Sequence, residues 1–375
     1  MNTHPDVVVI GAGIVGAACA EAIASDGMSV VVIDSGFTGS GTTAAGMGHL
    51  VVMDDSPAQL ALTMYSRMLW ADLAPELPPN VEYDACGTLW LAEDDGQLQL
   101  LDDKRALYIG AGVESELLSP YQLAAAEPNL RPGLAGALHV GGDGVLYPPN
   151  AARALLSRAV AKGAEVRESE NVLSIGAGKV TLGAETISCG HVVNAAGASA
   201  ADLTPGLPIV PRKGHLVITD RYPGFCRHQL VELGYLASAH TMSTESVAFN
   251  VQPRATGQLL VGSSREMAGW DATVNRAIVT RMLDRALDFM PSLAATSAIR
   301  IWTGFRPATP DKLPLIGQWE ATAGLWIAAG HEGLGITTSL GTARILADLI
   351  TGTAPAIDAA PYSPARLIQS GLAPQ

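Results

Sequence analysis

"DVVVIGAGIVGAACAEAIASDGMSVVVIDS", residues 6–35, decides the fold of this chain. The opening run 6–10 is almost entirely apolar, which is typical of a strand that parallel neighbours and helices bury on both faces. A GxGxxG pattern follows, then an alanine-rich segment that predicts a helix to about residue 25, then a second strand over 29–33. The stretch therefore predicts a strand–turn–helix–strand unit at the start of an α/β fold.

The three glycines of this unit indicate a bound dinucleotide. Gly11 permits a tight turn, Gly13 lets a pyrophosphate approach the backbone, and Gly16 lets the helix pack closely on the strand. The N-terminus of the helix adds free N–H groups and the positive end of its dipole. Asp34 lies where a carboxylate accepts hydrogen bonds from a ribose diol. The alternative is a glycine-rich turn in an ordinary βαβ unit, and the motif alone does not separate FAD from NAD.

A second strand–glycine–helix junction lies near the other end of the chain. The sequence "LWIAAGHEGLGITTSLGTARILADLI", residues 325–350, predicts a strand, a turn with glycines at 330, 333 and 335, and a helix. A second helix N-terminus at the same ligand suits a group that gains negative charge when it is reduced, as a flavin does. Nicotinamide needs no such partner, so this junction favours FAD.

The segments between the two junctions mix both element types. Helices are predicted within 54–80, 94–109 and 271–289, and strands dominate 210–261. We expect the acidic pair Asp54 and Asp55 to cap the first of these helices rather than to act as an acid–base pair, and Asn150 to cap a helix that Gly163 ends.

Composition excludes several classes of function. The chain is 48% hydrophobic and 16% charged, as expected for a globular protein, and its net charge of −13 argues against nucleic acid as a partner.

Apolar runs are too short to span a membrane, and the N-terminus shows no secretory signal, so we expect a cytoplasmic protein. The positive mean hydropathy fits either a large core or an apolar surface that partner subunits cover, and we expect an oligomer. Four scattered cysteines without a CxxC pair predict free thiols and no metal site.

The chain resembles the D-amino acid oxidase superfamily of FAD-dependent amine oxidoreductases, which contains glycine oxidase, sarcosine oxidase and D-amino acid dehydrogenase. The resemblance spans nearly the whole chain, and its motifs are "VVVIGAGIVGAACA" with Asp34, "DGVLYPPNAARAL", "HVVNAAGAS", "GFRPATPDKLPLIG" and "AAGHEGLGITTSLG". Within this group, "GTTAAGMGHLVVMDD" looks most like the catalytic subunits of D-hydroxyproline dehydrogenases and opine oxidases.

The resemblance implies an α/β fold in which a Rossmann-type FAD-binding domain carries an inserted α+β substrate domain built on an antiparallel sheet. The FAD-binding domain is expected over 1–80, 147–208 and 302–375. The substrate-binding domain is expected over 81–146 and 209–301.

The resemblance also implies which residues bind FAD. The residues expected at the pyrophosphate and adenosine are Gly11, Ala12, Gly13, Ile14, Val15, Gly16, Asp34 and Val172. Those expected along the cofactor towards its ring are Thr42, Thr43, Ala45, Gly46, Met47, Ala196 and Gly197. Those expected at the pyrimidine end of the flavin are Gly333, Leu334, Gly335, Ile336 and Thr337. Relatives with covalent flavin use a C-terminal cysteine, or a histidine where this chain has Ala45, so we expect non-covalent FAD.

Arg306 matches the arginine that binds the substrate carboxylate in glycine oxidase. It lies between a glycine and a proline in "GFRPATP", and these neighbours predict a rigid, irregular stretch of chain. Such a stretch could hold the guanidinium in place for bidentate recognition of a carboxylate. An ion pair at the surface or between domains is the alternative. His49 and His331 are candidates for the flavin edge or the substrate pocket, although most such histidines only form structural hydrogen bonds. His215 and His240 are weaker candidates of the same kind.

The predicted function is FAD-dependent oxidation of the C–N bond of a small amino or imino acid, with hydride transfer from Cα to flavin N5. D-hydroxyproline, another D-amino acid, glycine, N-methylglycine and opines are the candidate substrates. A partner subunit or an electron carrier is the expected acceptor, although an oxidase is not excluded. The alternatives are a non-catalytic FAD-bearing electron-relay subunit and, less favoured, an NAD-dependent dehydrogenase.

Overall fold

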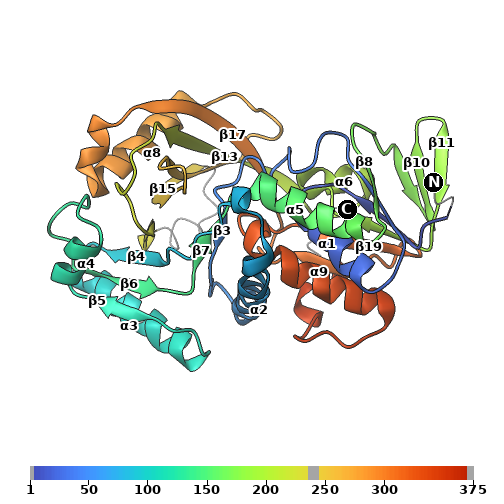
Figure 1. The fold of residues 1–375 in the computed structure, drawn as a ribbon, viewed down its shortest axis with the longest axis horizontal. Coiled ribbons are helices and arrows are strands. Elements are labelled where there is room, and N and C mark those ends of the chain that lie inside the picture. Colours follow the sequence, from blue (N-terminus) through green and yellow to red (C-terminus); the bar gives the residue numbers. More distant parts are fainter. Residues whose placement is uncertain (1–3, 235–244, 370–375) are drawn as a thin grey trace.

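The computed structural model describes residues 4–234 and 245–369 (Figure 1). Two sheets organise these residues, and each occupies one half of the molecule in Figure 1. Helix α2 (Pro57–Leu73) and the short strands β3 (His49–Leu50) and β7 (Gly144–Val145) lie between the halves. The connection between the two sheets therefore runs through the chain that directly follows the N-terminal unit.

The first sheet has six strands, of which all but one are parallel. In spatial order they are β18 (Leu315–Gln318), β19 (Leu325–Ala329), β12 (His191–Asn194), β1 (Val7–Ile10), β2 (Val30–Ile33) and β8 (Glu165–Arg167). Strand β2, which follows β1 in the chain, pairs with one edge of β1, and the later strand β12 pairs with the other edge. The strand order therefore reverses beside β1. In open α/β sheets, ligands bind in the crevice at the carboxyl ends of the strands at such a point.

Both faces of this sheet are covered, as the apolar run 6–10 predicts. Val7 and Val9 belong to a core with the helices α1 (Ile14–Ser25), α2, α5 (Pro148–Ala161) and α9 (Gly335–Thr351). Val8 and Ile10 belong to a second core on the opposite face. That face packs against a three-stranded sheet, which is formed by β9 (Ser174–Gly176), β10 (Lys179–Leu182) and β11 (Glu185–Ser188). The alternation of the side chains divides β1 between the two cores.

The second sheet has eight strands and is mainly antiparallel. In spatial order they are β17 (Ala298–Ala308), β13 (Val210–Thr219), β16 (Leu259–Glu266), β15 (Glu245–Pro253), β14 (Gln229–Glu232), β4 (Thr88–Ala92), β6 (Gly136–Val140) and β5 (Glu116–Leu118). Strands β14 and β4 pair in parallel, which the expectation of an antiparallel sheet did not include. The helices α3 (Asp95–Gly110), α4 (Pro120–Ala126) and α8 (Arg276–Phe289) accompany this sheet.

Short elements complete the described chain. They are α6 (Ala200–Leu203), α10 (Ala365–Gln369) and 3₁₀ helices at Ala74–Glu76, Pro79–Val81, Gly197–Ser199, Pro291–Ala295 and Ala360–Tyr362.

Two predicted helix caps are wrong. Helix α2 is capped by Ser56, whose hydroxyl accepts a hydrogen bond from the backbone N–H of Gln59 at 3.1 Å. The predicted cap Asp54 instead forms an ion pair with the buried Lys104. Serine accepts this hydrogen bond as well as aspartate does, so the position nearest the first helical turn takes the role.

Helix α5 begins at Pro148, two residues before the predicted cap Asn150. Proline suits the first helical position because its φ is fixed near helical values and it has no N–H to satisfy there. Asn150 lies inside the first turn, and its amide donates to the carbonyl of Asn80 at 2.7 Å.

The strands of the six-stranded sheet all fall within 1–80, 147–208 and 302–375, the ranges predicted for the FAD-binding domain. The strands of the eight-stranded sheet fall within 81–146 and 209–301, except β17, which crosses the predicted boundary at 301. The domain boundaries stay a prediction. Within the described residues, no helix is long and apolar enough to cross a membrane.

Candidate active site

A cleft of about 840 Å³ opens at the carboxyl ends of β1 and β12. Gly11 follows β1 with φ +105°, and a Cβ there would lie 2.5 Å from the carbonyl oxygen of Ala195, which follows β12. Only glycine fits this backbone conformation and this close approach. The first glycine of the motif therefore brings the ends of the two strands together at the floor of the cleft.

The N-terminus of α1 points its free N–H groups at the cleft. Its cap residue Gly13 has no side chain to satisfy them, and the N–H of Ile14 donates to the hydroxyl of Thr43 at 2.9 Å. The carboxylate of Asp34 is held by the N–H groups of Ala12 at 2.6 Å and Gly36 at 2.7 Å. Since a carboxylate oxygen accepts more than one hydrogen bond, Asp34 is positioned and still able to bind a diol.

The segment 41–48 lies along the cleft and links the two sheets. The hydroxyl of Thr42 donates to the carbonyl of Phe305 on β17 at 2.7 Å, and the amide of Gln252 on β15 donates to the carbonyl of Met47 at 2.6 Å. A Cβ at Gly304 would overlap the side chain of Ala45. The small residues of this segment therefore allow β17 to pack directly against it.

The second glycine junction also lines the cleft. Helix α9 begins at Gly335 without a side-chain cap, and the preceding Glu332 has a left-handed backbone with φ 47°. The N–H of Glu332 donates to the carbonyl of Pro307 at 2.9 Å, which ties this turn to β17. Two helix N-termini from opposite ends of the chain thus meet at one cleft, as the sequence predicts.

The structure brings most of the predicted cofactor residues together. Those that line the cleft are Gly11, Gly13, Ile14, Val15, Asp34, Thr42, Thr43, Ala45, Gly46, Met47, Val172, Ala196, Gly197, Gly333, Gly335 and Ile336.

Four of the predicted cofactor residues lie behind the wall or beside the cleft. Ala12 is fully buried, and a Cβ at Gly16 would overlap the carbonyl oxygen of Gly11, so Gly16 serves packing. Thr337 is buried and donates to the carbonyl of His49 at 2.8 Å. Leu334 lines a smaller neighbouring cavity.

Arg306 lies on β17, opposite Arg212 of β13, so the prediction of an irregular stretch is wrong. Strand β17 forms the edge of its sheet, where a following proline costs no ladder hydrogen bond. The guanidinium of Arg306 donates to the carbonyl of Ser264 at 2.9 Å and lies over Gly214, where a Cβ would overlap it. It lines both the cleft and the smaller cavity, so it stands where the two spaces meet.

His49 and His331 also line both spaces. Burial lowers the pKa of His49 to about 4 and that of His331 to about 3, so both rings are neutral at neutral pH. Nε2 of His331 is hydrogen-bonded to the hydroxyl of Thr342 on α9 at 2.9 Å, which gives this ring a structural role in the turn. Their catalytic roles stay predictions.

The low pKa of His331 predicts a specific loss of stability in acid. As pH falls below the reference pKa of 6.5, His331 of the unfolded chain becomes protonated, whereas His331 of the folded protein stays neutral down to about pH 3. The free energy of unfolding therefore decreases as pH falls from about 6.5 to about 3. In His331→Gln, we expect the difference in the free energy of unfolding between pH 7.5 and pH 5 to shrink by about 2 kcal/mol. Urea unfolding at both pH values measures it. The exposed His4, changed to Gln, is the control, and an equal effect in both variants would contradict the assignment to burial.

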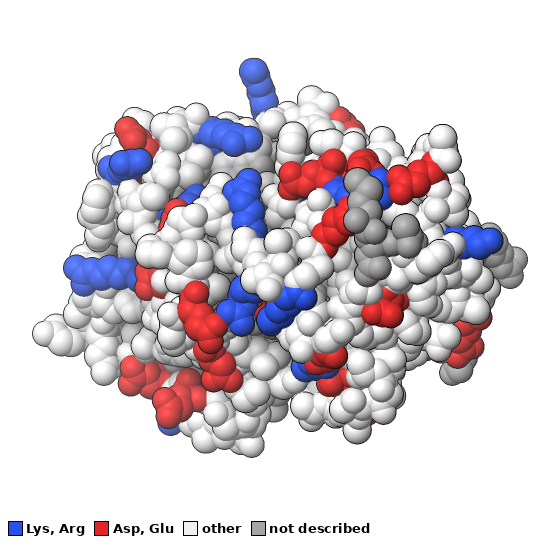
Figure 2. Space-filling view, turned by 45° about the vertical axis from the view of Figure 1, so that its right-hand side comes forward, with Lys and Arg blue, Asp and Glu red and all other residues white. Residues whose placement is uncertain are grey.

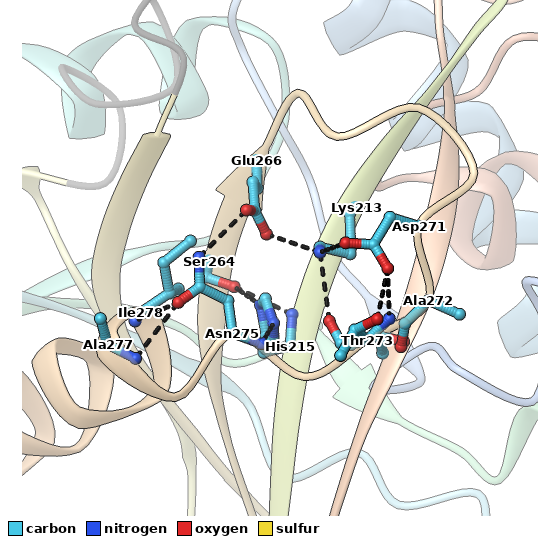
Figure 3. A network of polar contacts seen from close by, with 11 residues as sticks. Lys213, His215, Ser264, Glu266, Asp271, Ala272, Thr273, Asn275, Ala277 and Ile278 are labelled. Atoms are coloured by element: carbon cyan, nitrogen blue, oxygen red, sulfur yellow. Dashed lines mark hydrogen bonds and ion pairs between the residues drawn. The ribbon is translucent and has the colours of Figure 1, made fainter.

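His215 lies in a polar network on the other face of the second sheet (Figure 3). Its Nε2 accepts a hydrogen bond from the backbone N–H of Asn275 at 3.0 Å, so Nδ1 carries the proton and faces the hydroxyl of Ser264. In the same network, the buried Lys213 pairs with Glu266 at 2.9 Å. This geometry gives His215 a structural role. His240 lies outside the described residues.

Sequence reasoning missed several residues that line the two spaces. The ring of Trp270 packs edge-on against Phe305 with centroids 5.1 Å apart, and both residues line the cleft. The walls of the smaller cavity include Trp90, Gln229, Asn250 and Arg265. Phe305 lies in the motif of Arg306 but was not singled out, and Trp270 lies in a turn. The four residues of the smaller cavity come from strands without a motif, so no sequence signal marked them.

On the face drawn in Figure 2, Lys and Arg side chains stand singly or in small groups among Asp and Glu. No group of three or more His, Cys, Asp or Glu side chains in 4–234 and 245–369 is arranged to hold a metal ion.

The arrangement of the cleft fits FAD. Gly11 and Gly13 leave room for a pyrophosphate, the N-terminus of α1 faces it, and Asp34 is placed for the adenosine ribose. The N-terminus of α9 also offers its positive dipole end to the cleft, where such an end favours a reduced flavin. The residues present therefore suit a dinucleotide whose far end gains negative charge.

Comparisons with known proteins agree with this geometry. Residues 6–349 match the family model described as "FAD dependent oxidoreductase". Among curated proteins, the chain is 30% identical to glycine oxidase from Pseudomonas putida over 96% of this chain and 98% of that protein. It is 27% identical to the hydrogen cyanide synthase subunit HcnC of Pseudomonas aeruginosa over 98% of this chain and 97% of that one. Among solved structures, L-proline dehydrogenase from P. horikoshii superposes with a TM-score of 0.88 at 25% identity and 98% coverage of both chains.

Proposed function

The chain belongs to the FAD-dependent oxidoreductase family, with FAD as its cofactor, and from this premise we propose that it oxidises the C–N bond of a small amino or imino acid. The position of Arg306 carries the proposal. Its guanidinium lies where the smaller cavity joins the cofactor cleft, so a carboxylate bound there has its Cα beside the cleft. Relatives named glycine oxidase and L-proline dehydrogenase support this class of substrate.

The residues of the site bind and orient the substrate. Arg306 holds the carboxylate through two parallel N–H···O bonds, and its own position is fixed by the Ser264 carbonyl and by the space above Gly214. The neutral rings of His49 and His331 form part of the wall. Holding the reacting atoms at near-attack distance accounts for much of the rate in such a reaction.

Bound FAD would supply the acceptor for a hydride from Cα. In the neutral amine, Cα loses this hydride and the nitrogen loses one proton to water, so that one C–H bond and one N–H bond are replaced by the C=N bond of an imine. The imine of a primary amine is hydrolysed, whereas that of a ring amine such as hydroxyproline remains cyclic.

Three finer features belong to the same proposal. The six-stranded sheet and its helices, over 1–80, 147–208 and 302–375, form the FAD-binding domain, and 81–146 with 209–301 forms the substrate-binding domain. FAD is bound without a covalent link. The electrons pass to a partner subunit or carrier, which the relative named as a subunit of hydrogen cyanide synthase supports.

Anaerobic titration of the purified flavoprotein tests the proposal. D-hydroxyproline, D-amino acids, glycine, N-methylglycine and an opine are added one at a time, and the flavin absorbance near 450 nm is followed. We expect at least one of them to bleach the flavin within the dead time of mixing by hand. If none does, while dithionite reduces the same flavin, the proposal of amino acid oxidation is wrong and an electron-relay subunit takes its place.

Air is then admitted to the reduced protein. Slow reoxidation in air, together with fast reoxidation by an artificial electron acceptor, is the result expected of a dehydrogenase. Prompt reoxidation with formation of hydrogen peroxide would assign an oxidase instead.

A further inference from the structure

The smaller cavity continues from Arg306 away from the cofactor cleft. Its volume is about 70 Å³, which accommodates a few heavy atoms. Residues shared with the cleft are His49, Asn250, Arg306, His331, Glu332 and Gly333. A substrate whose α-carboxylate lies at this junction therefore directs its side chain or N-substituent into the smaller cavity.

A second arginine faces this space. Arg265 lies on β16 and is 7% exposed, and it lines the smaller cavity but not the cleft. Its Nε lies 4.0 Å from Glu332 Oε1, and the same oxygen accepts a hydrogen bond from Arg212 at 2.8 Å. The carboxylate of Glu332 thus faces two guanidinium groups beside the cavity. Arg306, Lys312 and Asp55 also line it, so cationic groups outnumber carboxylates around this space.

The strand register keeps Arg265 on the cavity face. Lys213 is opposite Glu266 and Arg212 is opposite Arg306, so alternation places Arg212, Arg306 and Arg265 on one face and Lys213 and Glu266 on the other. On that other face, Lys213 also donates to the carbonyl of Thr273 at 3.2 Å (Figure 3). The buried pair therefore fixes β16 at Glu266, the residue that follows Arg265.

Apolar side chains of Val51, Met53, Val231 and Leu334 line part of the smaller cavity, but the rest of its wall carries polar atoms without internal partners in the described chain. Nε1 of Trp90, Oε1 of Gln229 and Oδ1 of Asn250 are buried, and none has a hydrogen-bond partner within the described part of the chain. All three residues line the smaller cavity. Leaving such atoms unsatisfied costs about 1–3 kcal/mol each, so this wall favours a polar group and disfavours an alkyl one.

We propose that the substrate carries a second carboxylate and that Arg265 binds it, while Arg306 binds the α-carboxylate. The proposal rests on the proposed function and names its substrate class: dicarboxylic amino or imino acids. A carboxylate in the smaller cavity meets Arg265 directly and accepts a hydrogen bond from Nε1 of Trp90, while the amide oxygens of Gln229 and Asn250 accept from N–H donors of the substrate. It also offsets the positive charge that surrounds Glu332.

Matched pairs of substrates test the proposal by kinetics. Iminodiacetate is compared with N-methylglycine, and D-glutamate with its neutral isostere D-glutamine, with an artificial electron acceptor. We expect kcat/KM to be at least about 10-fold higher for the dicarboxylate of at least one pair. Arg265→Met should lower that kcat/KM by about 30-fold or more and change the value for the neutral partner less than about 3-fold. The proposal is overturned if the neutral members are preferred, or if Arg265→Met lowers both members equally.

Thermal unfolding gives a readout that does not depend on turnover. Malonate, succinate and glutarate should raise the Tm of the flavoprotein more than acetate, propionate and butyrate at equal concentration and ionic strength. The extra increase should vanish in Arg265→Met and persist in part in Arg265→Lys, which keeps the charge but loses the planar fork. Arg281→Met, a change of an exposed arginine on α8, should leave it unaltered.

The two readouts separate the two proposals. Selective stabilisation by dicarboxylates without reduction of the flavin by any amino acid would support the Arg265 site and refute the proposed function. Reduction by neutral amino acids alone, without selective stabilisation, would support the proposed function and refute the Arg265 site. Flavin content and the Tm without ligand verify that each variant is folded.

Discussion

Arg306→Ala is expected to lower kcat/KM for the amino or imino acid substrate by about 10²- to 10³-fold. Removing one partner of a buried, hydrogen-bonded charge pair costs about 2–5 kcal/mol, and each 1.4 kcal/mol corresponds to a factor of 10. Since the guanidinium binds substrate and not cofactor in this geometry, the FAD content should stay unchanged. Steady-state kinetics and the ratio of flavin to protein absorbance measure the two quantities.

Two further variants sharpen this prediction. Gly214→Ala adds a methyl group where the guanidinium of Arg306 lies, and because an arginine side chain is flexible, the protein should fold with Arg306 displaced. We expect it to raise KM with less change in Tm than a core substitution causes. Arg281→Ala removes an equal charge from the surface and should keep kcat/KM within about 2-fold. An unchanged KM in both Arg306→Ala and Gly214→Ala would refute the role of Arg306.

Gly16→Ala is expected to abolish most FAD binding and to lower the Tm by about 5 °C or more. The added Cβ would overlap the carbonyl oxygen of Gly11, which is backbone and has no freedom to move aside. Relief requires helix α1 to shift from β1, and this shift also moves the N–H groups that face the pyrophosphate. Overpacking of this kind commonly costs about 1–3 kcal/mol and sometimes more. Flavin absorbance after gel filtration and thermal unfolding measure the two effects.

Gly110→Ala is the matched control. Gly110 is also a helical glycine, at the end of α3, but a Cβ there meets nothing within 4 Å. Alanine is favoured over glycine in helices by about 1 kcal/mol, so we expect an unchanged or slightly higher Tm and full FAD content. Equal FAD content in Gly16→Ala and Gly110→Ala would contradict the packing role of Gly16.

Most of the residues that the sequence assigns to the cofactor line one cleft, for a physical reason. Binding a pyrophosphate close to backbone requires glycines at fixed spacing after a strand, so Gly11, Gly13 and the junction near Gly335 carry a local signal. The strand at 7–10 and the helix that ends at residue 25 follow from the same stretch, and the structure confirms both.

The substrate half was predictable only in part. Arg306 was recognised from its motif, but its strand was not, because glycine and proline neighbours usually indicate irregular chain. Gln229, Asn250 and Arg265 are at least 15 residues apart in sequence, and they meet only because β14, β15 and β16 pair in one sheet. Local periodicity carries no information about such pairings, which depend on long-range contacts.

The order of the strands in the first sheet has a consequence for biosynthesis. Strand β1 pairs with β12, which pairs with β19, and the second helix N-terminus follows only at residue 335. The nascent chain therefore emerges from the ribosome with its first glycine motif complete and its cofactor cleft still missing two walls. We therefore expect the flavin to be loaded only after α9 has been synthesised, and chains that lack α9 to accumulate as apoprotein exposed to cellular proteases.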